Sequence, residues 1–180
     1  MTNSGTQQSD ISSALLIFLV SADYIEDKRD FPWGLRLSIA SGIAKGLAFI
    51  YQSSEDQEEI IPHGNLKLSN ILLDENNVPL IGEYGFSRFL DSTKHCVLNP
   101  ISGYTAPEKS FTEKGDVFSF GVILLELLTG KTVEKSGIDL PKWVRAVVTE
   151  EWTGEVFDEE VSKAAIHWAF PLLNIALKCV

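Results

Sequence analysis

Three short segments of the sequence hold the side chains whose types and order could serve chemistry. They are His63–Asn70, Glu83–Gly85 and Ala106–Glu108. His63 is of a type that can bind phosphate or a metal ion, whereas the Asn65 amide can hydrogen-bond a hydroxyl group but cannot take its proton at pH 7. Each segment alone is a weak signal, so its meaning depends on the elements that position it.

The segments lie among elements that are mainly helical. Apolar residues recur at helical spacing over residues 33–52, which predicts an amphipathic helix there. Gly42 and Gly46, four residues apart in this helix, lower its intrinsic stability but permit close packing. The run Lys114–Thr129 is apolar almost all round and predicts a central buried helix, which Gly130 ends.

Two further helices and a small hairpin complete the predicted unit. The helices are Leu140–Thr149 and Ala164–Cys179, and the short strands are Ile60–Ile61, Ile71–Leu73 and Leu80–Ile81, with a turn at Asn76-Asn77. Residues 86–113 show no period and are expected to form a long loop. The sequence therefore predicts a mainly α fold with a small β-hairpin.

Composition limits the classes of function. The 180 residues include 15 basic and 25 acidic ones, and the net charge of −10 argues against nucleic acid as a partner, because phosphate backbones are repelled. Two cysteines are too few for a disulfide framework. The most apolar run, residues 14–20, is well short of the roughly 20 residues of a membrane-spanning helix. Residues 1–13 are small and polar, which predicts a disordered start.

Taken together and in this order, the segments resemble a eukaryotic protein kinase. His63–Asn70 is similar to the catalytic loop, Glu83–Gly85 to the metal-binding motif, Ala106–Glu108 to the end of the activation segment, and Asp116–Gly121 to part of the central helix. The runs HGNLKLSNILLDE, SGYTAPEK and KGDVFSFGVILLELLTGK resemble plant leucine-rich-repeat receptor-like kinases, whose inactive members typically carry HGN in place of HRD. The resemblance covers residues 31–180 and implies a kinase-like C-terminal lobe.

The chain departs from the family pattern at the residues that would carry catalysis. The resemblance places Asn65 where the catalytic aspartate is expected, and Gly64 where an arginine senses a phosphorylated loop. Glu83 stands at the metal-binding aspartate, one methylene longer. Lys67 and Asn70 match the pattern, which implies that Lys67 contacts phosphate and Asn70 a metal ion. Losing a positioned base removes a factor of about 10²–10⁴ in rate, so efficient phosphoryl transfer is not expected.

The resemblance also implies structural roles and candidate modification sites. The structural residues are His63, Tyr84, Gly85, Glu108 and Asp116, with His63, Tyr84 and Asp116 in the lower part of a spine. The family pairs the glutamate at Glu108 with a later arginine, but Arg145 is the last arginine here. The candidate phosphorylation sites are Ser92, Thr93, Ser102 and Thr105. Acidic residues from 150 to 160, Asp158 among them, are interpreted as a solvated face.

Two parts of a complete kinase domain are expected to be absent from the chain. No Gly-rich loop and no Val-Ala-x-Lys strand precede residue 31, so the N-terminal lobe is expected to be missing, and the last helix is expected to be truncated. Residues 1–30 are a divergent segment in which 14–20 is expected to be a remnant of the strand between the lobes. If unpaired, that strand would be an exposed edge.

Three hypotheses on function follow. The first is a pseudokinase that acts through protein–protein interaction in signalling. The second is an ATP-dependent serine/threonine kinase with degenerate motifs, and the third is a truncated product without independent function. The pseudokinase hypothesis expects no bound cofactor, and Mg·ATP is implied only by the resemblance. It expects signalling proteins or another kinase as partners. The location would be cytoplasmic, on the intracellular side of a plasma-membrane receptor.

Overall fold

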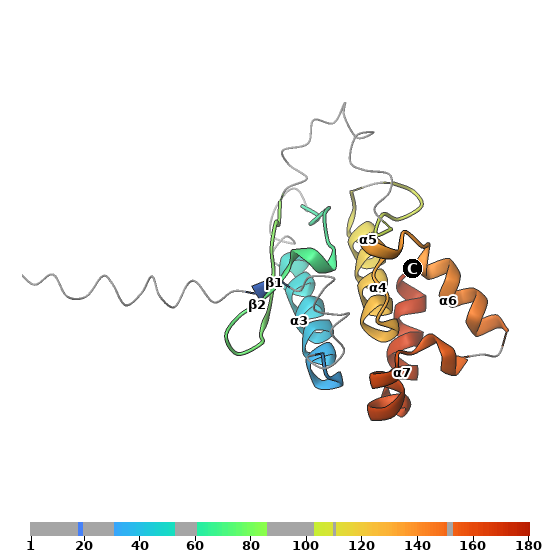
Figure 1. The fold of residues 1–180 in the computed structure, drawn as a ribbon. Helices are drawn as coiled ribbons and strands as arrows, with labels where there is room; N and C mark the ends of the chain where they lie inside the picture. Colours follow the sequence, from blue (N-terminus) through green and yellow to red (C-terminus); the bar gives the residue numbers. More distant parts are fainter. Residues whose placement is uncertain (1–17, 20–30, 53–60, 86–102, 110, 151–152) are drawn as a thin grey trace, which may run out of the picture.

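The computed structural model describes residues 18–19, 31–52, 61–85, 103–109, 111–150 and 153–180. The predicted disordered start over 1–13 and the candidate phosphorylation sites Ser92, Thr93 and Ser102 lie outside these ranges. In the described part, helices dominate and a small sheet lies at one side of them (Figure 1). The prediction of a mainly α fold with a small hairpin is confirmed.

Helix α3 spans Trp33–Gln52, as the periodicity predicted. Its buried residues are Arg36, Ile39, Ala40, Ile43 and Leu47. The sheet packs against this helix at two glycines. A Cβ atom on Gly42 would lie 2.0 Å from Cγ of Pro79, and one on Gly46 would lie 2.6 Å from Cδ1 of Ile81. The two glycines therefore let the backbone of α3 approach the sheet closely.

Strands β2 (Ile71–Leu73) and β3 (Pro79–Ile81) form the predicted antiparallel hairpin. The Asp74 carboxylate accepts the backbone N–H groups of Asn76 and Val78 at 2.8 and 2.7 Å. Asn77 takes a φ of 60°, a left-handed conformation that asparagine tolerates better than most residues. Local side-chain chemistry thus fixes the turn.

Strand β1 (Phe18–Leu19) pairs antiparallel with β2, so the sheet has the order β1-β2-β3. The described part of the expected strand remnant over 14–20 therefore pairs with β2 on one side and forms an edge of this sheet. The predicted strand at Ile60–Ile61 is wrong at Ile61, which lies in irregular structure, and Ile60 lies outside the described residues. Two apolar residues are too short a run to distinguish a strand from a half-buried connection.

Helix α4 (Glu113–Thr129) is the central element and lies between α3 and α7 (Figure 1). Thr112 caps its N-terminus, because its Oγ1 accepts the N–H of Gly115 at 3.1 Å. Gly130 ends it in a left-handed conformation with a φ of 65°. Every residue from 121 to 129 is buried, which confirms the helix that the all-round apolar run predicted.

The remaining helices form the C-terminal part of the chain. They are α5 (Val133–Ser136), α6 (Leu140–Thr149), the 3-10 turn η5 (Thr153–Val156) and α7 (Glu159–Cys179). The predicted start of α7 at Ala164 is five residues late. Asp158 caps the helix by accepting the N–H of Val161 at 2.8 Å, and non-helical torsions at Ala165 (φ −154°) interrupt it. The apolar periodicity therefore detected only the part after the kink.

A buried ion pair joins α3 to the start of α7. Nη2 of Arg36 lies 2.6 Å from Oδ2 of Asp158, and the two side chains are 0% and 3% exposed. Nη1 of Arg36 also donates to the carbonyl of Leu127 in α4 at 2.7 Å. The interpretation of Asp158 as part of a solvated face is therefore wrong, because its charge has a partner far away in the sequence.

Among the described helices, none combines the length and the apolar character that crossing a membrane requires.

Candidate functional site

Asp116, in the first turn of α4, holds the segment that leads into the candidate site. Its carboxylate accepts the backbone N–H of His63 at 2.6 Å and that of Gly64 at 2.9 Å. The Tyr51 hydroxyl, near the end of α3, also donates to this carboxylate. Burial raises the pKa of Tyr51, and the hydrogen bond to the Asp116 carboxylate adds to this rise. Asp116 thus anchors the segment to two helices at once.

His63 is buried, and both of its ring nitrogens have partners. Nδ1 accepts the backbone N–H of Asn65 at 3.2 Å, so Nε2 carries the proton and donates it to the carbonyl of Gly82 at 2.8 Å. The neutral imidazole therefore links the segment to the residue that precedes Glu83. Because both ring nitrogens are engaged, His63 has no free lone pair with which to bind a metal ion or to accept a proton from a substrate.

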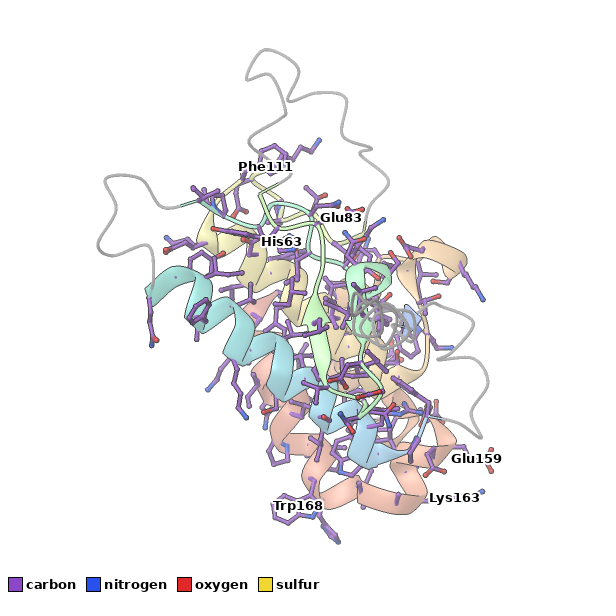
Figure 2. The ribbon with its side chains drawn as sticks, turned by 90° about the vertical axis from the view of Figure 1, so that its left-hand side faces the viewer. His63, Glu83, Phe111, Glu159, Lys163 and Trp168 are labelled. Carbon is purple, nitrogen blue, oxygen red and sulfur yellow. The ribbon has the colours of Figure 1, made fainter. Side chains whose placement is uncertain are left out.

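Asn65, Asn70 and Glu83 meet at one carboxylate oxygen. Nδ2 of Asn65 lies 2.7 Å from Oε2 of Glu83, and Nδ2 of Asn70 lies 3.0 Å from the same oxygen. Nδ2 of Asn70 also donates to the backbone carbonyl of Asn65 at 2.8 Å. Figure 2 shows Glu83 near His63 at one end of the molecule, with Trp168 at the opposite end. Three residues singled out in the sequence thus lie together, and we call them the amide–carboxylate cluster.

Lys67 does not join this cluster. Its Nζ lies 3.3 Å from Oε1 of Glu134 in α5, and the two side chains are 31% and 38% exposed. The Ser69 hydroxyl donates to the same Glu134 oxygen at 3.1 Å. Glu134 was not recognised in the sequence, since a four-residue helix far along the chain carries no periodic signal. The ammonium group that the resemblance assigned to phosphate is therefore in contact with Glu134.

The other predicted structural residues occupy different positions. Tyr84 is 47% exposed, and its ring centroid lies 6.2 Å from that of His63. Gly85 has a φ of 78°, which a residue with a side chain rarely adopts. Glu108 and the candidate phosphorylation site Thr105 are exposed. Of the predicted spine, His63 and Asp116 are therefore buried and in contact, whereas Tyr84 lies at the surface.

A second buried carboxylate, Glu126, lies beneath the segment that resembles the end of the activation loop. It is 0% exposed and accepts the backbone N–H of Val133 at 2.8 Å. The Tyr104 hydroxyl, whose oxygen lies 2.8 and 2.7 Å from the two Glu126 oxygens, donates its one hydrogen to the same group. Burial raises the pKa of Glu126 to about 8, although these hydrogen bonds favour its charged form. A single acid within an apolar helical run is the signal that could have identified this residue.

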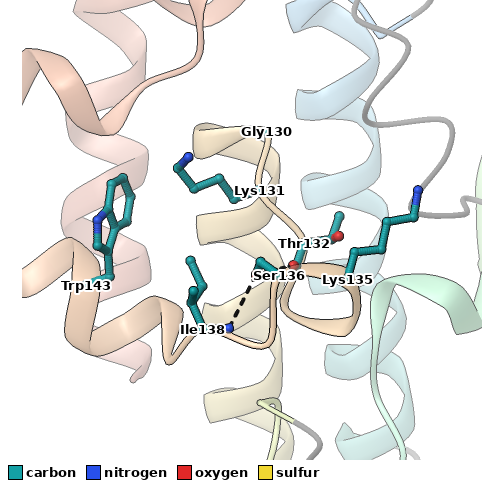
Figure 3. A pocket seen from close by; sticks show the side chains of 7 residues that line it. All are labelled: Gly130, Lys131, Thr132, Lys135, Ser136, Ile138 and Trp143. Carbon is teal, nitrogen blue, oxygen red and sulfur yellow. Dashed lines mark hydrogen bonds between the residues drawn. The ribbon is translucent and has the colours of Figure 1, made fainter.

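A pocket of about 470 Å³ lies where α4, α5 and α6 meet (Figure 3). Its lining residues are Gly130, Lys131, Thr132, Lys135, Ser136, Ile138 and Trp143. The Lys131 ammonium lies 5.2 Å from the centroid of the Trp143 ring, a cation–π contact at the pocket wall. The lining includes no member of the amide–carboxylate cluster.

Comparisons with known proteins identify the family to which this fold belongs. A protein kinase domain model matches residues 16–164. The leucine-rich repeat receptor-like protein kinase PXC1 of Arabidopsis thaliana is 42% identical over 174 residues, which cover 82% of this chain and 25% of that protein. The Arabidopsis thaliana protein named "Probable inactive receptor kinase RLK902" is 41% identical over 138 residues, covering 72% of this chain and 21% of that protein. The chain thus spans about a quarter of the length of these relatives.

Two solved structures are also similar. The pseudokinase domain of BIR2, described as an immune regulator of the RLK/Pelle family, superposes with a TM-score of 0.74 at 30% identity, covering 90% of this chain and 50% of that one. The kinase domain of maize SIRK1, bound to AMP-PNP, gives 0.73 at 33% identity, covering 91% and 59%. The chain therefore belongs to the protein kinase domain family, as a partial domain similar to plant leucine-rich-repeat receptor-like kinases.

Proposed function

We propose that this chain is a kinase-fold signalling module that binds other proteins and does not transfer phosphate efficiently. The observation that carries the proposal is the contact of the Asn65 amide, at the position that the family resemblance assigns to the catalytic base. Its nitrogen donates to Glu83 at 2.7 Å, and an amide has no basic lone pair with which to take a proton from a hydroxyl group. The position that would activate a nucleophile is therefore occupied by a hydrogen-bond donor.

The contact of Lys67 adds only a small barrier to phosphate binding, because the ion pair is about one third exposed. A lysine that holds a transferred phosphoryl group must direct its ammonium at the phosphate. Here the ammonium lies at Glu134 instead, 3.3 Å from its carboxylate. Reaching a phosphate would require breaking that ion pair.

Relatives named as inactive and a relative solved with a nucleotide analogue both bear on the proposal. RLK902 is named as inactive, and BIR2 as a pseudokinase. By this likeness, we propose signalling proteins or another kinase as partners, and the intracellular side of a receptor membrane as the location. Maize SIRK1, solved with AMP-PNP, favours a second candidate function, an ATP-dependent serine/threonine kinase, because Lys67 and Asn70 retain the residue types of the family.

Thermal melting and phosphate transfer test the proposed function together. The purified chain is melted with and without millimolar Mg·ATP, and then incubated with radiolabelled Mg·ATP and casein. A ligand at 100 times its Kd stabilises the native state by about 2.7 kcal/mol, a visible shift, and the maize SIRK1 kinase domain serves as the nucleotide-binding control. We expect no shift and no labelling. Labelling that disappears in Lys67→Ala would establish the second candidate instead.

A further inference from the structure

We propose that Asn65 takes the place of a divalent cation at Glu83, so that the amide–carboxylate cluster is stable without metal. The family resemblance implies a metal ion bound between the residues at Asn70 and Glu83. The donor set at Oε2 of Glu83 does not fit that ion, because the partners of this oxygen are the N–H groups of two amides. This inference rests on the proposed function, since it assigns a role to the same residues.

The geometry of the two amides carries the first step. Both Nδ2 atoms lie within 3.0 Å of a single oxygen, Oε2 of Glu83. The orientation of Asn70 is fixed independently, because its Nδ2 also donates to the carbonyl of Asn65 at 2.8 Å, and a flipped amide would set two oxygens against each other. A cation at this oxygen would meet N–H hydrogens, which carry partial positive charge, so the amides and the ion compete for one place.

The backbone around Glu83 holds the carboxylate at the amides. Gly82 is fixed on both sides, because its N–H donates to the carbonyl of Asn70 at 2.8 Å and its carbonyl accepts from Nε2 of His63 at 2.8 Å. Glu83 then adopts a φ of 61°, a left-handed conformation that is unfavourable for a residue with a side chain. Two hydrogen bonds to its charged carboxylate offset this strain, and such bonds are stronger than those between neutral groups.

Charge favours an asparagine over an aspartate at position 65. The nearby ammonium of Lys67 is bound to Glu134, so it does not neutralise Glu83. An aspartate at position 65 would bring a second carboxylate to about the 2.7 Å that now separates Nδ2 of Asn65 from the Glu83 oxygen. Two carboxylates at such a distance repel each other strongly unless a proton or a cation lies between them.

The test replaces Asn65 and measures thermal stability without any nucleotide. In buffer with EDTA, Asn65→Asp is expected to melt about 3–8 °C below the wild type because of the repulsion between carboxylates. Millimolar Mg²⁺ or Mn²⁺ is expected to restore most of that loss, since a cation would then bridge the introduced carboxylate and Glu83 in the variant. The wild type is expected to melt at the same temperature in EDTA and in metal.

Two control variants separate metal binding from other effects. Asn65→Leu removes the donor without adding charge, so it is expected to lose stability that metal does not restore. The double variant Asn65→Asp/Glu83→Gln removes the repulsion, because the glutamine amide can donate to the aspartate, and it is expected to lose the response to metal. Potassium chloride at matched ionic strength is expected to restore less than Mg²⁺ does, since screening alone does not bridge the carboxylates.

Each remaining outcome decides the proposal. The proposal would be overturned if metal raised the melting temperature of the wild type as much as it raised that of Asn65→Asp. It would also be overturned if Asn65→Asp were as stable as the wild type in EDTA. If Asn65→Asp is recovered folded only from buffer that contains metal, this is the expected metal dependence in a stronger form. If Asn65→Asp folds in neither buffer while the double variant folds, the proposed bridging of the two carboxylates by metal is refuted. The proposed function fails on phosphate transfer instead, so the two failures are distinguishable.

Discussion

The polar contacts that join the helices and those that form the candidate site differ in burial. Between α3, α4 and α7, the Arg36–Asp158 pair is almost fully excluded from water, and Glu126, which joins α4 to Tyr104 and to the start of α5, is 0% exposed. At the candidate site, Glu83 is exposed, and the Lys67–Glu134 pair is about one third exposed. Removing a partner from a buried charge is costly, whereas an exposed pair contributes little to stability.

This difference teaches how a kinase fold can keep its scaffold while the side chains at its candidate site vary. The buried contacts fix where the helices lie, and none of them uses a side chain that would touch a phosphate or a metal ion. The candidate site sits on that scaffold, anchored by Asp116, which binds the backbone of His63 and Gly64 and leaves their neighbours free to vary. This anchor uses only backbone groups of His63 and Gly64, so the side chain at position 65 can differ without disturbing it.

Removing the guanidinium of Arg36 is expected to have the largest effect. In Arg36→Met, the buried Asp158 carboxylate loses its cation and Leu127 loses its hydrogen-bond donor. The free energy of unfolding, measured with urea, is expected to fall by about 3–5 kcal/mol, a large part of the about 5–15 kcal/mol of a typical domain. The double variant Arg36→Met/Asp158→Ser keeps a residue that can cap α7 and is expected to recover part of this loss. A loss below about 1 kcal/mol in Arg36→Met would contradict the comparison.

Replacing Glu126 with glutamine is expected to have a smaller effect that depends on pH. Burial raises the pKa of Glu126 from 4.5 in the unfolded chain to about 8. The native state therefore holds a proton that the unfolded state has lost, so the contribution of Glu126 is full below pH 4.5 and falls as pH rises towards 8. Relative to Glu126→Gln, the wild type is expected to lose about 1 kcal/mol per pH unit in this window.

Urea unfolding of both proteins from pH 5.5 to 8 measures this difference, in which titrations shared by the two proteins cancel. A difference that stays constant with pH would show that Glu126 is charged in the native state throughout. Because Glu126 accepts from Tyr104, a matched control is Tyr104→Phe, which removes one hydrogen bond that favours the charged form. In Tyr104→Phe, the pH at which half of the stabilisation by Glu126 is lost is expected to be higher than in the wild type.

Local sequence predicted the elements well where a periodic pattern is long. The bounds of α3 and the burial of α4 followed from runs of apolar residues, and the close approach at Gly42 and Gly46 followed from their spacing. The start of α7 was misplaced because the cap at Asp158 and the kink at Ala165 break the pattern. Periodicity reports one face of one helix and says nothing of an interruption within it.

The candidate site was predicted in residues but not in contacts. The resemblance to protein kinases singled out Asn65, Asn70 and Glu83, which the structure brings to one oxygen. The partner of Lys67 was not predictable, since it depends on how α5 folds back over residues far earlier in the chain. Arg36 and Asp158 were missed for the same reason. A pairing between distant residues is a property of the tertiary fold, which short motifs do not encode.

The smallest effect is expected at the Lys67–Glu134 pair, where the comparison is tested from its exposed side. The variants Lys67→Ala and Glu134→Ala and their double form a mutant cycle measured by urea unfolding. The coupling energy is expected to be about 0.2–1 kcal/mol and to shrink with added salt, because water and ions reach both groups. Ser69→Ala removes the neutral donor to the same carboxylate and serves as the salt-insensitive control. A coupling above about 2 kcal/mol would mean that Lys67 is as firmly held as the buried contacts are. In that case α5 would belong to the scaffold, and Lys67 could not turn towards a phosphate without a cost comparable to that of opening the core.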